Sequence, residues 1–120
     1  MTSYEVVWFL NHKYGEQAYV IETDKQILIF TSKSKWIIFK DDRKRFKAYT
    51  LFHSNYEKGE GYHIQRYGNC IDFLTWCAVT HDMEEYYEDK DFQKFTLSWE
   101  LYLLGRECEE RAALFQWFCD

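Results

Sequence analysis

Three side chains in the second half of the sequence have types and spacing that suit a metal. Cys70, Cys77 and His81 lie at i, i+7 and i+11, so a helix would place them on one face. Thiolate and imidazole bind zinc, and a fourth ligand could come from Cys108 or His63. Zinc sites favour a tight Cys-x-x-Cys knuckle, however, and the sequence has none. The simpler interpretation places both cysteines in the core, and we predict no metal and no cofactor.

A nucleophilic enzyme would pair a cysteine with a histidine. His53, His63 and His81 are candidates for the base, but spacing does not select among them. No nucleophile-elbow glycines flank any of the cysteines. We therefore predict no catalytic residue and no enzymatic activity.

Residues 33–49 combine cations with aromatic rings. Cations that follow phosphates, beside rings on which bases stack, are typical of single-strand nucleic-acid binding. The alternative explanation is an edge hairpin that carries Lys and Arg to block edge-to-edge aggregation. The candidate nucleic-acid-binding residues are Lys33, Lys35, Trp36, Lys40, Arg43, Lys44, Arg45 and Lys47.

Residues 82–91 hold six carboxylates, offset only by Lys90. Helical spacing sets carboxylates several ångströms apart, as successive phosphates are along a nucleic-acid strand. Such a segment could occupy a basic nucleic-acid groove as a decoy, although acidic helix ends are often only solvated. The candidate partner-binding residues are Asp82, Glu84, Glu85, Tyr86, Tyr87, Glu88, Asp89 and Asp91.

Charge and composition limit the classes of function. The net charge of −5 and the pI near 5.4 argue against a general nucleic-acid or anionic-membrane binder. Residues 1–66 carry eleven cations and eight acids (+3), whereas residues 67–120 carry four and twelve (−8), which suggests two electrostatic faces. Aromatic residues make up 21% of the chain, so some are expected at the surface, where they mark contact sites.

The N-terminal residues lack the basic region of a signal peptide, and no apolar run is long enough for a transmembrane helix. The four cysteines therefore favour reduced thiols over a disulfide scaffold. We expect a cytoplasmic protein.

Short apolar runs that are rich in β-branched and aromatic residues predict strands. The runs are 4–10, 18–23, 27–31, 36–40, 46–53 and 62–67. Residues 27–30 are continuously apolar, as expected for a strand that is covered on both faces.

Two helices are expected to follow the strands. The first begins after an N-cap at Asn69, with Asp72 reaching back to the cap, and ends near Glu88; Asp89 or Asp91 caps the second. The fold class is therefore α+β: an antiparallel β-meander of about five strands followed by two C-terminal α-helices packed on one face. We expect a single domain over residues 1–120, mainly β in 1–67 and mainly α in 69–119.

The last helix carries a heptad seam that predicts its buried face. The seam positions are Leu97, Leu101, Leu104, Cys108, Arg111, Phe115 and Phe118. Leu101 and Leu104 are expected in the core. Arg111, a charge on an apolar seam, requires a carboxylate or solvent, and one possible carboxylate lies across a homodimer contact through this helix.

These patterns indicate a small intracellular protein-interaction domain with a basic partner. In its most specific form it is an inhibitor or adaptor, in general character like the small phage proteins that inhibit nucleic-acid-binding host enzymes. The alternative is a single-stranded nucleic-acid-binding module that uses residues 33–49.

Overall fold

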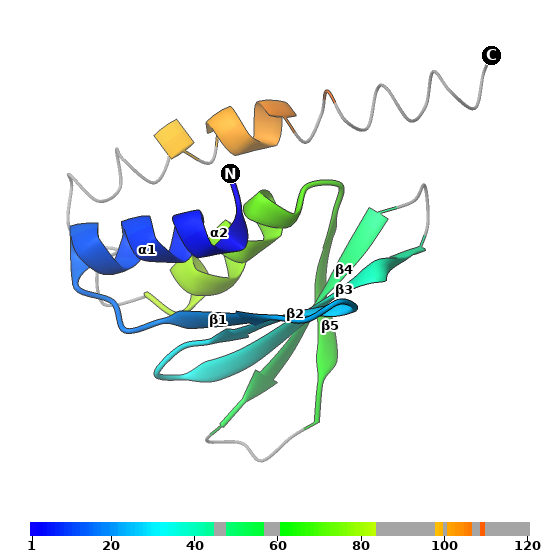
Figure 1. Ribbon diagram of the computed structural model, residues 1–120, viewed down its shortest axis with the longest axis horizontal. Helices are drawn as coiled ribbons and strands as arrows, with labels where there is room; N and C mark the ends of the chain where they lie inside the picture. Colours follow the sequence, from blue (N-terminus) through cyan, green and yellow to red (C-terminus); the bar gives the residue numbers. More distant parts are fainter. Residues whose placement is uncertain (45–47, 57–60, 84–97, 100, 107–108, 110–120) are drawn as a thin grey trace.

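The computed structural model describes residues 1–44, 48–56, 61–83, 98–99, 101–106 and 109, with the backbone alone for residues 42–44. The described elements form three layers (Figure 1). An antiparallel sheet is the first layer, two helices cover one of its faces, and the helical residues 98–99 and 101–106 lie across those helices. The predicted α+β class, with strands followed by helices, is confirmed.

The first element is a helix, α1 (Ser3–Tyr14), where the sequence analysis predicted a strand over residues 4–10. That prediction is wrong. Thr2 is the N-cap and forms a capping box with Glu5, and Gly15 ends the helix at φ 70°, a left-handed conformation that glycine adopts without strain. Both ends of the helix are thus set by local hydrogen bonds, which the β-branched composition of the segment concealed.

Burial also favours the helix over the strand. Val6, Val7 and Leu10 lie on one helical face and are all buried against the sheet and the neighbouring helix. Trp8, on the opposite face, is 61% exposed and stacks on His12. In a strand, successive side chains would point to opposite faces. A single covered face could not then bury both Val6 and Val7.

Five antiparallel strands follow in a simple meander of order β1-β2-β3-β4-β5. They are β1 (Tyr19–Glu22), β2 (Gln26–Phe30), β3 (Ser34–Lys44), β4 (Ala48–Asn55) and β5 (His63–Gly68). The predicted strands from residue 18 onward all overlap these elements. Because β3 is the central strand, the explanation of its cations as protection of a sheet edge is wrong.

Alternation along the strands sends one set of side chains into the core. Ile27 and Ile29 of β2, Trp36 and Ile38 of β3 and Leu51 of β4 are at most 1% exposed and face the helices. Their neighbours along each strand point to the opposite face of the sheet.

Helix α2 (Ile71–His81) packs beside α1 on the same face of the sheet. Its N-cap is Cys70, which makes no side-chain capping bond, so the predicted cap at Asn69 is wrong. Its C-cap is Asp82, so α2 ends before the predicted Glu88. Residues 84–97, with the predicted cap of the last helix, lie outside the described residues.

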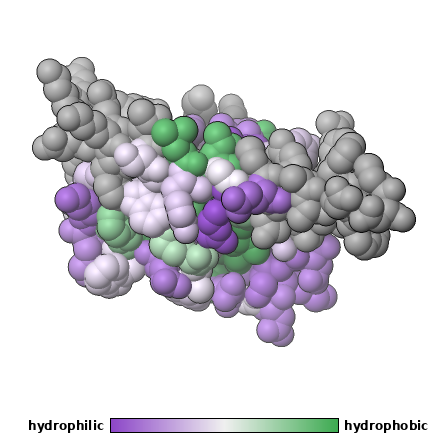
Figure 2. Space-filling model, turned by 90° about the horizontal axis from the view of Figure 1, so that it is seen from above, coloured by the Kyte–Doolittle hydropathy of each residue, from purple (hydrophilic) through white to green (hydrophobic). Residues whose placement is uncertain are grey.

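The described part of the last helix corrects the heptad prediction. Leu103 is fully buried, whereas Leu101 is 60% and Leu104 40% exposed. Trp99, one turn before Leu103, contacts the rings of Phe9 and Trp76, so this helix is rotated relative to the predicted seam. Hydrophobic residues therefore remain at the surface on this side of the molecule (Figure 2). The other seam positions, Leu97, Cys108, Arg111, Phe115 and Phe118, lie outside the described residues.

A buried carboxylate also ties the last helix to α2. Asp72 is 3% exposed, and its Oδ2 forms an ion pair with the guanidinium of Arg106. The carboxylate raises the pKa of Arg106 above its ordinary value. The amino group of Met1 lies 3.3 Å from the same oxygen, and the Phe73 N–H donates to Oδ1 at 2.8 Å.

The described cysteines, Cys70 and Cys77, form no disulfide. Among the described helices, none is both long and apolar enough to cross a membrane.

The rotated last helix leads to a direct test. Replacing Leu103 by Ala should lower the free energy of unfolding by about 2–5 kcal/mol, because it leaves a cavity in the hydrophobic core. Leu101→Ala is the matched control and should change it by less than about 0.5 kcal/mol, since that side chain is already solvated. Urea denaturation of both variants measures the difference. Equal midpoints would contradict the observed orientation.

Candidate functional site

The register of the sheet places three ring side chains next to one another on its inner face. Trp36 on β3 pairs with His53 on β4, which pairs with His63 on β5. The Trp36 and His53 rings stack with centroids 3.9 Å apart and planes 19° apart, and His63 meets the edge of His53 at 5.0 Å. Trp36 and His53 are buried, whereas His63 is exposed.

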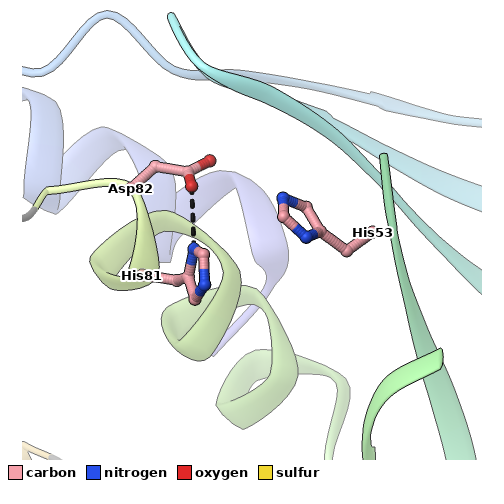
Figure 3. Close-up of side chains that lie close together, drawn as sticks. All are labelled: His53, His81 and Asp82. Atoms are coloured by element: carbon pink, nitrogen blue, oxygen red, sulfur yellow. Dashed lines mark hydrogen bonds and ion pairs between the residues drawn. The ribbon is translucent and has the colours of Figure 1, made fainter. Parts of the chain in front are cut away.

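A buried carboxylate from the end of α2 completes this cluster (Figure 3). The Asp82 Oδ2 atom accepts hydrogen bonds from Thr31 Oγ1 at 2.6 Å and from Trp36 Nε1 at 2.9 Å. Its Oδ1 atom contacts Ser34 Oγ at 3.2 Å and His81 Nδ1 at 2.9 Å. Because α2 ends directly above the turn between β2 and β3, a single carboxylate joins that turn, the central strand and the helix.

The carboxylate determines where the protons of the cluster lie. A carboxylate can only accept, so the hydroxyl proton of Ser34 points to Asp82 and the ring proton of His81 lies on Nδ1. His53 Nε2 lies 2.8 Å from Ser34 Oγ, and with the hydroxyl proton already donated, the imidazole must be the donor there. Both tautomers follow from hydrogen-bond geometry.

The Ser34–His53 contact has the distance of a nucleophile–base pair, yet it does not form a hydrolase site. Ser34 is fully buried, so no substrate reaches its hydroxyl. Asp82 also contacts the serine and His81, whereas a catalytic triad would use the carboxylate to orient the base. As arranged, these groups anchor the fold and present imidazoles to a buried carboxylate.

Cys70, Cys77 and His81, the combination that the sequence analysis considered and did not adopt as a metal site, do not come together in the described structure. His81 instead lies with His53 and Asp82, where one potential ligand atom from each residue falls within 4.8 Å of the others. Cys77 lies 3.5 Å from a guanidinium nitrogen of Arg66. No local pattern predicts the observed cluster, because His53 and His81 are on different elements and meet through the tertiary fold.

Of the predicted acidic partner-binding residues, the structure describes one. Asp82 is 5% exposed and fully engaged inside the molecule, so it is not part of a contact surface. The rest, namely Glu84, Glu85, Tyr86, Tyr87, Glu88, Asp89 and Asp91, lie outside the described residues.

The predicted nucleic-acid-binding residues do not share one surface. Trp36 is fully buried and bonded to Asp82, so no base can stack on it. Lys33 is exposed, Lys35 is half-buried on the outer face of the sheet, and Lys40 pairs with Glu22 at 3.6 Å at the sheet's β1 side. The side chains of Arg43 and Lys44, and all of Arg45 and Lys47, lie outside what the structure describes.

The outer face of the sheet carries the second candidate site. Register pairs connect one apolar side chain on every strand into a continuous row, and all described helices lie on the other side (Figure 1). We call this the apolar row; its members are Ile21, Leu28, Ile37, Phe52 and Ile64.

Solvent reaches this row in the described structure. Ile21 and Ile64, on the two edge strands, are 46% and 53% exposed, and the three central members are half-buried. The continuous apolar run at residues 27–30 predicted a strand covered on both faces, whereas the described elements cover only one of them.

Aromatic rings surround the apolar row. Tyr19 stacks on Phe30 at 4.7 Å, and Phe39 meets the edge of Phe52 at 5.7 Å. The Lys35 ammonium lies 5.3 Å from the Phe30 ring centroid and 5.9 Å from that of Tyr62. The face is thus apolar at its centre, with aromatic rings on both flanks and the Lys35 cation on the flank of Phe30.

No protein-family profile matches the chain, and no curated protein or solved structure matches it.

The Asp82 cluster predicts a large loss of stability on truncation. Asp82→Ala leaves buried donors from Thr31, Ser34 and Trp36 without their acceptor, and the free energy of unfolding should fall by about 3–5 kcal/mol. Asp24→Ala, at an exposed turn position, is the control and should change it by less than about 0.5 kcal/mol. Equal effects in a urea titration would rule out the anchoring role.

Proposed function

We propose that the chain is a protein-interaction domain and that the outer face of its sheet is the binding surface. One observation supports this most strongly: the apolar row runs across all five strands on a face that no described element covers. An antiparallel sheet with one solvated face normally places polar residues there. Contiguous exposed apolar patches on soluble domains usually mark contact sites.

The composition of this face resembles the interior of a protein interface. Half-buried Leu28, Ile37 and Phe52 lie at the centre, and more polar positions such as Gln26 and Lys35 lie beside them. Because these side chains are held on paired strands, little conformational entropy is lost when a partner covers them. The face is therefore preorganised for association.

Charge suggests the chemistry of the partner. Lys35 lies beside the apolar row, Lys33 is exposed in the preceding turn, and residues 1–66 carry a net +3. A partner that matches this face presents an apolar surface bordered by carboxylates. The acidic residues from 84 to 91 remain a second proposed contact, for a basic partner, and the inhibitor or adaptor role is compatible with either surface.

Substitutions on the sheet should abolish binding without unfolding the domain. In the double variant Ile21→Ser/Ile64→Ser the two most exposed members of the row become polar. A protein retained by the immobilised wild-type chain should be lost by this variant, and its dissociation constant, measured by calorimetry with the purified partner, should rise at least about tenfold. Leu101→Ser, exposed on the helix side, is the matched control and should bind normally.

A different result would identify the acidic segment, and not the sheet, as the binding surface. If the double variant binds like the wild type and Glu84→Gln/Glu85→Gln/Glu88→Gln abolishes binding, the acidic segment is the contact surface and the sheet is not. The two surfaces also differ in salt dependence, since association through exposed carboxylates weakens steeply with ionic strength and burial of the apolar row does not.

A nucleic-acid function is the alternative, and one observation favours it. Lys35 lies beside the Phe30 and Tyr62 rings on an open sheet, and aromatic rings on such a surface can stack unpaired bases. The net charge of −5 and the burial of Trp36 oppose it.

Fluorescence anisotropy with labelled single-stranded DNA and RNA separates the two functions. We expect no binding at micromolar concentration in physiological salt. Micromolar binding that falls with salt and is lost in Lys35→Gln would support the nucleic-acid function in place of the protein-interaction function.

A further inference from the structure

We propose that His53, His81 and Asp82 form a binding site for a divalent transition metal of the Zn²⁺ type. One potential ligand atom from each residue lies within 4.8 Å of the other two. His53 comes from β4, whereas His81 and Asp82 come from the end of α2, so the site joins the sheet to the helix (Figure 3). This inference is independent of the apolar row, which lies on the opposite face of the sheet.

The donor set selects the class of metal. Two imidazole nitrogens and one carboxylate oxygen suit Zn²⁺, Co²⁺ and Ni²⁺, whereas Mg²⁺ and Ca²⁺ prefer oxygen ligands throughout. Three protein ligands leave a fourth position. His63, which meets the edge of His53 at 5.0 Å and is exposed, is placed to fill it, and a water molecule is the other choice.

Surrounding groups already hold the ligands in place. Thr31 and Trp36 both donate to Oδ2 of Asp82, which leaves Oδ1 directed toward the His81 imidazole. The Trp36 ring stacks on His53 and fixes the plane of that imidazole. Partners of this kind orient the ligands of most protein metal sites.

Binding requires a small, definable rearrangement. Ligands on one zinc ion are roughly 3.3 Å apart, given bonds of about 2.0 Å in a tetrahedron, so the side chains must converge. The metal replaces the protons at His81 Nδ1 and His53 Nε2, and each neutral ring then carries its proton on the other nitrogen. His81 has 40% of its side chain exposed, which gives the ion a route from solvent.

Titration of the full-length chain with Zn²⁺ and with Co²⁺ tests the proposal. Isothermal calorimetry should show one Zn²⁺ per chain, with affinity that falls on acidification because protonated imidazole cannot ligate. His81→Gln and His53→Gln should each weaken binding at least about tenfold. His12→Gln, on the outer side of α1, is the control and should bind like the wild type.

The Co²⁺ spectrum separates this site from one built on cysteines. We expect visible absorption of a low-symmetry Co²⁺ complex without an intense near-ultraviolet thiolate band. A thiolate band, or equal affinity of the wild type and His81→Gln, would overturn the proposal, as would the absence of saturable binding. If His53→Gln does not fold, the half-exposed His81 still provides the test, and X-ray absorption of the Zn²⁺ complex must show nitrogen and oxygen ligands only.

Discussion

The fold depends on one buried carboxylate at the end of α2. Asp82 is 5% exposed, and a charge in that position is tolerable only because four donors surround it. One of the donors comes from the β2–β3 turn, two come from the central strand and one comes from the preceding helical residue. Each element therefore constrains the others: if the turn or the end of the helix moved, the carboxylate would lose its partners. This requirement fixes the position of α2 above the sheet and, with it, the packing of α1.

Adjacent residues on the central strands serve the two proposed roles separately. Trp36 and His53 point inward to the buried polar cluster, whereas Ile37 and Phe52, their neighbours along the chain, point outward into the apolar row. Strand alternation thus places a candidate metal site and a candidate binding surface back to back. A partner on the outer face would complete the covering of a sheet whose residues are apolar on both sides, and a metal on the inner face would reinforce the contact between sheet and helix.

Local signals determined much of this protein's architecture. Turn residues and short apolar runs predicted the antiparallel meander from residue 18 onward, because hairpin pairing is settled by neighbours in the sequence. The continuous run at residues 27–30 predicted a strand covered on both faces, but the described elements cover only one face of β2. Helix α1 was encoded locally as well, by Thr2, Glu5 and Gly15, although composition pointed to a strand. In that segment the capping signal was the more informative one.

Tertiary structure alone decided the candidate sites. The approach of His53 to His81 depends on the register of β4 and on the residue at which α2 ends. Neither feature produces a periodic pattern that could be recognised in the sequence. The choice of Leu103 over Leu101 as the buried residue depends on the rings that Trp99 meets on α1 and α2. The sequence determined which segments pair and which faces are apolar, because hydrogen bonding and alternation act between near neighbours. Long-range packing determined which polar groups meet, because the free energy gained by burying side chains depends on contacts between elements that are far apart in the chain.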